Sequence, residues 1–223
     1  MKRYSFDLYP ELIGYIDSIR DKQNIVSIIT GITRFLINAT SCDLVDEAKP
    51  IKDGRIRIVI CVDKMSRVFL IDGDKIHSFC FPFSIENEGN NFRITHEHVS
   101  VTSVSCSVLS AVFNNSFEGK SIEYVMERYW DIATDFEIGS DNKENYGHLI
   151  VYMLLFEPGY LRLDYDKNNE SEGTHPLNHI DVNYANPNTY KIGLPNKWNC
   201  ESMINFVNIK KPCPLFLTEN VSN

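Results

Sequence analysis

The most constraining feature of the sequence is a pair of apolar runs on either side of Asp72-Gly73. The run SRVFLI precedes Asp72-Gly73 and the run DKIHSFCFPFSI follows it, and the earlier run RIRIVICVD, which begins at Arg55, carries isoleucine at every second position. Alternation of this period places successive side chains on opposite faces of a strand, and Asp-Gly between two such runs is a strong signal of a β-hairpin. A further strand, NNFRITHEHVSV, follows a Gly-Asn-Asn turn. Residues 55–103 are therefore predicted to form a β-meander.

Apolar spacings of three and four residues predict helices at two places. Residues 9–40 carry isoleucine, leucine and phenylalanine at this spacing, although Gly31 weakens one turn and a break near Gln23-Asn24 would divide the segment in two. Residues 120–136, KSIEYVMERYWDIATDF, carry a second apolar stripe, and the serine before it is suited to cap the helix.

The other segments alternate between helix and strand. Residues 104–115 fit either a helix or a strand, and residues 139–145 are predicted to be a polar loop. The continuously apolar GHLIVYMLLFEPG, residues 147–159, is predicted to be a central strand covered on both faces. The runs YLRLDYD, HPLNHIDVNY and TYKIGL are expected to be strands, and NCESMINFVNI a short closing helix. The pattern indicates an α+β fold, a mostly antiparallel sheet with helices packed on one face and an N-terminal helical segment.

The size of the chain suits a single domain. Its 223 residues are 43% hydrophobic and 12% aromatic, which is enough to bury a sizeable core. We expect one domain over residues 1–223, with a helical N-terminal segment at 1–50 and an α+β core at 51–223.

Net charge and cysteine usage exclude several classes of protein. A net charge of −8 disfavours non-specific binding to nucleic acid or anionic lipid, which requires lysine and arginine against phosphates. No apolar run reaches about 18 residues, and the first residues lack the apolar centre of a signal peptide. The six cysteines include no Cys-x-x-Cys pair, which disfavours a structural zinc site. A cytoplasmic protein with reduced cysteines and no membrane association is expected.

The stretch from Tyr160 to Tyr184 carries the candidate site. Strand alternation gives each of its two predicted strands one apolar and one polar side. If the strands pair across the loop at 167–176, the polar sides form one face, and His175 lies beside it. The side chains expected on or beside this face are Tyr160, Arg162, Asp164, Asp166, His175, His179, Asp181 and Asn183.

Two interpretations of this face remain open. Clustered carboxylates attract a divalent metal, for which Asp164, Asp166 and His179 are the candidate ligands, and phosphodiester hydrolysis is the matching chemistry. His175 and His179, with the three aspartates that include Asp181, are then the candidate catalytic groups. Alternatively, the face is a solvated sheet surface with ordinary cross-strand ion pairs. Arg162, Asn183 and Tyr160 would then contribute to binding a partner.

Other candidate residues carry weaker signals. His96 and His98 are two apart in a predicted strand and could share a face, but no third ligand is near in sequence. His77 and His148 lie in apolar runs typical of core or edge positions. The chain contains no G-x-S-x-G, G-x-G-x-x-G or Walker motif, so serine-hydrolase, NAD and ATP functions have no support.

The fragments LRLDYD, THPLNHIDVNY, YKIGLP and CESMINFV resemble the C-terminal part of an uncharacterised bacterial family, the domain of unknown function 2290. Their order is more faintly similar to small toxins of bacterial toxin–antitoxin pairs. The match covers about a third of the chain, and Asn178 and Asp181 stand where the toxin pattern has histidines. The resemblance implies a prokaryotic protein of a phage-defence or toxin–antitoxin locus.

Two functions follow from these observations. The first is a non-catalytic component that binds another protein, which the acidic charge, the absent catalytic motifs and the polar face of the predicted strands favour, and its oligomeric state is left open. The second is a metal-dependent, nuclease-like effector that uses the Asp/His patch. Whether the chain is an enzyme is left open, and a divalent metal is the sole cofactor candidate.

Overall fold

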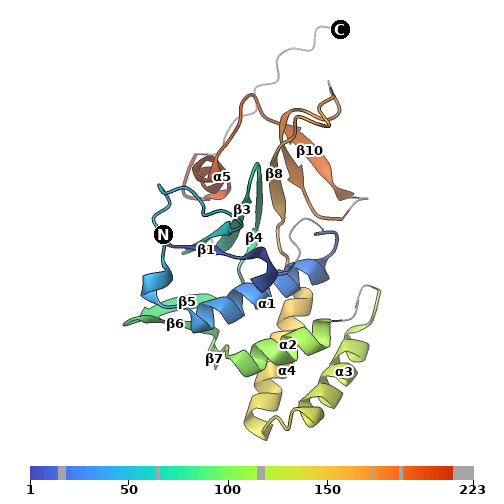
Figure 1. Cartoon of the computed structure of the whole chain (residues 1–223). Helices are drawn as coiled ribbons and strands as arrows, with labels where there is room; N and C mark the ends of the chain where they lie inside the picture. The colour runs from blue at the N-terminus through green and yellow to red at the C-terminus, as the bar shows by residue number, and fades with distance from the viewer. Residues whose placement is uncertain (15–18, 64–65, 115–118, 172, 186–187, 213–223) are drawn as a thin grey trace.

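The structure is a computed structural model of the whole chain, and it describes all residues except 15–18, 64–65, 115–118, 172, 186–187 and 213–223. Seven strands form the main antiparallel sheet, in the order β1-β2-β3-β4-β8-β9-β10. Their bounds are β1 Lys2–Leu8, β2 Ile56–Val62, β3 Arg67–Asp72, β4 Lys75–Cys80, β8 Leu161–Tyr165, β9 Asn178–Val182 and β10 Tyr190–Gly193. The α+β prediction is confirmed (Figure 1).

A second, small sheet and five helices complete the described part of the chain. The small sheet consists of β5 (Ser84–Glu88), β6 (Asn91–His96) and β7 (Val99–Ser100). The helices are α1 (Lys22–Asn38), α2 (Ser103–Phe113), α3 (Ile122–Asp135), α4 (Ser140–Leu155) and α5 (Cys200–Val207), with short 3-10 turns at Pro10–Leu12 and Ser41–Asp43. The small sheet and α2–α4 form one long insertion between the neighbouring strands β4 and β8.

The predicted hairpin is confirmed as β3–β4. Asp72 pairs with Lys75, so Gly73 and Asp74 form the turn, and Gly73 adopts a positive φ of 56°. A two-residue turn of this kind matches the twist of the flanking strands. The predicted meander is nevertheless split, because the chain leaves the main sheet after Cys80 and pairs again in the small sheet.

The N-terminal helical segment is wrong in its first part, because the chain begins with β1. Helix α1 begins only at Lys22, where Asp21 and Asn24 form a reciprocal capping box. Packing explains the glycine at position 31, although the sequence did not reveal it. A Cβ there would lie 2.8 Å from the Cα of Ile13, so glycine lets the 3-10 turn approach the helix. Ile16, part of the predicted apolar stripe, lies outside the described residues.

The predicted central strand at 147–159 is also wrong. These residues belong mostly to α4, which begins at Ser140 and therefore includes the predicted polar loop. A continuously apolar run has no period that separates a buried strand from a buried helix. A Cβ added at Gly147 would lie 3.3 Å from Cε1 of Tyr129 in α3. Glycine at this position therefore allows α4 to pack closely against α3. The ambiguous segment at 104–115 is helical as α2, and α3 begins after the predicted cap Ser121.

Both faces of the main sheet are covered. One apolar core joins the face of β1–β4 that carries Ile58 and Leu70 to helices α1–α4 and the small sheet. A smaller core lies on the opposite face, where Phe69 packs with Met203 and Ile204 of α5. The expectation of helices on one face therefore holds for α1–α4, whereas α5 covers the other face. Among the described residues, no helix combines the length and apolar character that crossing a membrane requires.

Candidate functional site

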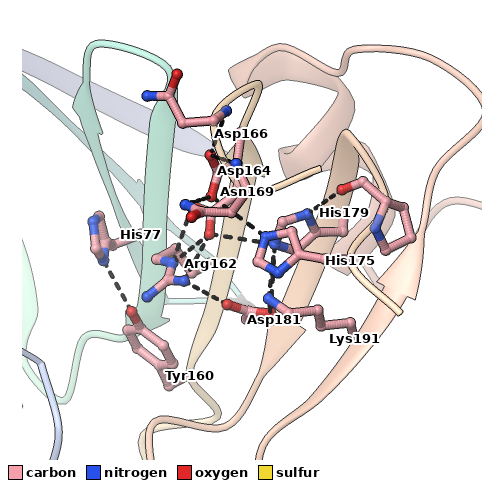
Figure 2. A network of polar contacts seen from close by, with 12 residues as sticks. His77, Tyr160, Arg162, Asp164, Asp166, Asn169, His175, His179, Asp181 and Lys191 are labelled. Carbon is pink, nitrogen blue, oxygen red and sulfur yellow. Dashed lines mark hydrogen bonds and ion pairs between the residues drawn. The ribbon is translucent and has the colours of Figure 1, made fainter. Parts of the chain in front are cut away.

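The pairing on which the predicted site depends is confirmed. Strands β8 and β9 are antiparallel neighbours, with Arg162 opposite Asp181 and Asp164 opposite His179. Strand β10 adds Lys191 on the far side of Asp181. Because paired residues point to the same face, all five side chains gather in one polar network (Figure 2).

This face is not the open, solvated surface that strand alternation suggested. Leu70 of the main core pairs with His77, which in turn pairs with Arg162, so the network continues the core face of the sheet. His179 is 0% exposed, Asp164 6% and Asp181 7%. Buried charges of this kind are costly unless they are paired and hydrogen-bonded.

Arg162 connects the two buried carboxylates. Its Nε donates to Asp164 Oδ2 at 2.8 Å and to Oδ1 at 3.0 Å, and its Nη2 donates to Asp181 Oδ2 at 2.5 Å. Burial opposes the charged form of Arg162, but the hydrogen bond and charge of Asp164 outweigh this effect and the pKa of the guanidinium is raised. The arginine is thus a permanent cation held between two aspartates.

His179 is fixed in a single orientation. Its Nδ1 lies 2.7 Å from the carbonyl oxygen of Pro176, which can only accept, so Nδ1 carries the proton. The lone pair of Nε2 then faces Lys191, whose ammonium lies at 2.9 Å and also donates to Asp181 Oδ1 at 2.6 Å. The ammonium therefore occupies the position between His179 and Asp181 that a bound cation would take.

The ligand atoms of a metal site are close together. One atom each from Asp164, His179 and Asp181 lies within 4.8 Å of the other two. Two carboxylates and one imidazole nitrogen suit Mn²⁺ or Zn²⁺. The network already contains cations for its carboxylates, however, because the two aspartates are matched by Arg162 and Lys191. Asp181 rather than Asp166 is the third member of this group.

Asp166 lies apart from the group and holds the loop that follows β8. Its carboxylate accepts hydrogen bonds from the backbone of Asn168 and from the backbone and side chain of Asn169. The side-chain bond from Asn169 is the main reason why the pKa of Asp166 is lowered. Nε2 of His175 lies 3.3 Å from Oδ2 of Asp166, and the ring of His175 packs edge-on against that of His179, with centroids 4.7 Å apart. His175 thus lies over the network as expected.

Tyr160 and Asn183 take structural positions at the edge of the network. The hydroxyl of Tyr160 forms a hydrogen bond of 2.9 Å with Nδ1 of His77, and burial raises the pKa of the tyrosine. Asn183 ends β9 with a positive φ of 70°, and its side-chain oxygen accepts from the backbone of Tyr184 and Ala185. His77, expected to be a core residue, connects the apolar part of the face to the polar part.

Lys191 is the residue that sequence reasoning missed. It lies in the run TYKIGL, which was expected to be a strand but had no assigned neighbour. The alternation of this run shows which side chains share a face, but it does not give the register against β9. The sequence therefore contained no signal that would have placed Lys191 beside Asp181.

The remaining histidine predictions change with the structure. His96 is the last residue of β6, Glu97 adopts a positive φ of 52°, and His98 lies in the following turn. The two histidines therefore do not share the face of one strand. His148 is exposed on helix α4 and not in a strand.

Buried thiols show no sign of catalytic activation. Cys61 and Cys106 are fully buried, and desolvation raises the pKa of Cys106 to about 11. A thiol with a raised pKa is a poor nucleophile at neutral pH. Cys213 lies outside the described residues.

Comparisons with models of protein families, with curated proteins and with solved structures found no match to this chain. The resemblance of the C-terminal third to a bacterial family therefore receives no support from them. The inference of function depends on the geometry of the chain itself.

Proposed function

We propose that this chain is a non-catalytic component that binds a basic segment of a partner protein. The observation that carries the proposal is the outer side of α3, here called the acidic–aromatic face. Tyr124 is 46% exposed on it and Trp130 48%. Four exposed acidic side chains lie on the same helix: Glu123, Glu127, Asp131 and Asp135.

The positions of these residues form one continuous surface. At about 100° per residue, the two aromatic and four acidic side chains occupy one arc of the helix, opposite the buried Val125, Tyr129 and Ala133. Exposed aromatic residues among charges are typical of binding surfaces rather than of solvated helix faces. The ring of Tyr124 already has a cation over it, because Lys120 Nζ lies 5.2 Å from the ring centroid.

The charge of the face determines the chemistry of the partner. Four carboxylates repel phosphates and attract lysine and arginine, which favours a basic protein segment over nucleic acid. Arg128 of the same helix is half-buried and donates to the carbonyl oxygen of Ala111 at 2.8 Å.

The polar network on β8–β10 supports a non-catalytic function. Its carboxylates are matched by Arg162 and Lys191, and the side chains of these two cations are only 25% and 28% exposed. A substrate would have to displace them to reach His179. We further propose that this component belongs to a prokaryotic phage-defence or toxin–antitoxin system, which is what the resemblance of the C-terminal third implies.

A titration with nona-arginine peptide tests the proposal. In a Trp198→Phe variant Trp130 is the remaining tryptophan, so its fluorescence reports binding at α3. The peptide is expected to change this fluorescence in a saturable way. Glu127→Lys/Asp131→Lys should weaken the binding about tenfold, because it reverses two charges in the contact.

The matched control is Asp53→Lys/Glu86→Lys, which changes the net charge equally at exposed positions outside α3. This control should bind the peptide nearly as well as the parent variant. If both double variants weaken peptide binding equally, the peptide is attracted by net charge alone, and the proposal is overturned. The absence of a saturable change would also overturn it.

A second candidate function is a metal-dependent, nuclease-like effector. The closeness of the ligand atoms of Asp164, His179 and Asp181 favours it, with His175 beside them as the acid/base candidate. Lys191 would have to withdraw for a metal to enter. Incubation of plasmid DNA and of RNA with the protein and Mn²⁺ tests this function. Cleavage that His179→Ala abolishes would establish it, whereas no cleavage by the wild type would exclude it for these substrates.

A further inference from the structure

A cavity lies on the opposite face of the main sheet from the polar network. It has a volume of about 310 Å³ and lies between β3, β4, β8 and β9 on one side and the segments 49–51 and 197–200 on the other. This volume is at the lower end of the range of small-molecule sites in proteins. None of the residues proposed above for binding the partner lines it.

Most of the cavity wall is apolar. Ile71, Ile76 and Leu163 contribute the floor from the sheet, and Trp198 contributes an aromatic surface from the loop before α5. The indole of Trp198 is held by the ring of Phe206 in α5, with centroids 5.5 Å apart. Such walls favour a flat, apolar ligand.

Asn178 provides a polar group that lacks a partner. Its position in β9 has the same parity as Ile180 of the smaller core, so its side chain points to this face. The side-chain oxygen is buried, and among the described residues it has no hydrogen-bond partner. An unsatisfied buried acceptor is unfavourable, and a ligand that donates a hydrogen bond to it would recover this loss.

The cations beside the cavity are already engaged. Arg57 is bound by both oxygens of Asp7 and by the carbonyl oxygens of Glu47 and Lys49. Lys197 pairs with Asp74 of the β3–β4 turn. Of the three cations that line the cavity, only the exposed Lys49 has no such engagement described, so the lining favours a neutral ligand over an anion.

Asp74 and Lys197, two exposed residues that line the cavity, form an ion pair. It connects the turn of the β3–β4 hairpin to the loop that carries Trp198, and Lys197 Nζ lies 4.2 Å from the ring centroid of Tyr165. We propose that this cavity binds a small, neutral, planar molecule that donates one hydrogen bond from O–H or N–H to Asn178.

Three related probes test the proposal: 2-naphthol, 2-methoxynaphthalene, which lacks the donor, and 2-naphthoate, which carries a negative charge. The protein carries Trp130→Phe, on α3 and outside the cavity, so Trp198 gives the remaining indole N–H signal in a ¹H–¹⁵N spectrum. 2-Naphthol should shift this signal saturably and bind about tenfold tighter than either other probe.

Two variants separate the parts of the proposal. Asn178→Leu should remove the preference for 2-naphthol over 2-methoxynaphthalene, while Asn178→Asp, which keeps an acceptor, should retain it. Ile51→Phe at the half-buried wall should weaken all three probes. No saturable shift of Trp198, equal affinity for the donor and methoxy probes, or tighter binding of 2-naphthoate would each overturn the proposal. None of these outcomes bears on peptide binding at α3.

Discussion

On the sheet face that α1 covers, the half made by β1–β4 is apolar and the half made by β8–β10 is charged. A single row of paired residues crosses both halves, and consecutive members lie opposite one another on neighbouring strands. The row consists of Phe6, Ile58, Leu70, His77, Arg162, Asp181 and Lys191. Backbone pairing is continuous along the row, so the change in character is a property of the side chains alone.

Both halves are buried, but different forces hold them. Leu70 is 0% exposed within the apolar core that the helices share, and Asp181 is 7% exposed within the charged network. The apolar half is stabilised by the removal of its surface from water. The charged half is stabilised only while each carboxylate keeps its cation. On this face of β8–β10, burial therefore reflects a closed set of charges rather than apolar packing.

The largest expected effect is a loss of stability in the charged half that further substitutions can restore. Arg162→Met should lower the free energy of unfolding by about 3–5 kcal/mol, because Asp164 is left as an uncompensated buried charge. Further replacement of Asp164 and Asp181 by Leu and of Lys191 by Met should restore most of the loss. Urea unfolding measures both.

Leu70→Ala is the matched change in the apolar half and should cost about 2–5 kcal/mol. No combination of substitutions on β8–β10 should rescue it. A loss below about 1 kcal/mol for Arg162→Met would mean that the charged half is effectively solvated.

A smaller effect is expected at the border between the halves. Tyr160→Phe removes the hydroxyl that is bonded to His77, at a site where both side chains are buried. The loss should be about 1–2 kcal/mol. Tyr165→Phe, at the end of β8, is the control, because no hydrogen bond of its hydroxyl is described, and it should change stability little. Thermal unfolding of the two variants measures both losses of stability, and equal losses would contradict a contribution from the Tyr160–His77 hydrogen bond.

The smallest effect concerns pH. The pKa of Asp166 is lowered in the folded protein, mainly by Asn169, so this group stabilises the fold above its unfolded pKa of about 3.8. That contribution is lost as pH falls through the lowered folded value. The melting temperature of Asp166→Asn should therefore be lower than that of the wild type at pH 6, and the difference between the two should be smaller at pH 3. A difference that is independent of pH would contradict this assignment.

Strand alternation predicted that Arg162, Asp164, His179 and Asp181 share one face if the two strands pair, and the structure meets this condition with the β8–β9 pairing. It could not place Lys191, since nothing in the run TYKIGL fixes its register against β9. Nor did it reveal that the polar face continues the main core, which depends on the distant pairing of β4 with β8.

The helical errors have a different cause. In α4 the apolar run from Leu149 to Phe156 is too uniform to show a period, and the packing of Gly147 against Tyr129 decides for the helix. At the N-terminus, β1 is recruited by β2, which follows about 50 residues later, and local propensity carries no information on such a partner.

The most direct measurement is calorimetric titration of Mn²⁺ and of Zn²⁺ into the wild type, Lys191→Met and Asp164→Ala/His179→Ala. If the Lys191 ammonium fills the cation position, the wild type and the double variant show no saturable binding. Lys191→Met then gains binding, because Asp181 and the lone pair of His179 are released. Binding by the wild type that Asp164→Ala/His179→Ala abolishes would contradict a self-contained network and establish a metal site.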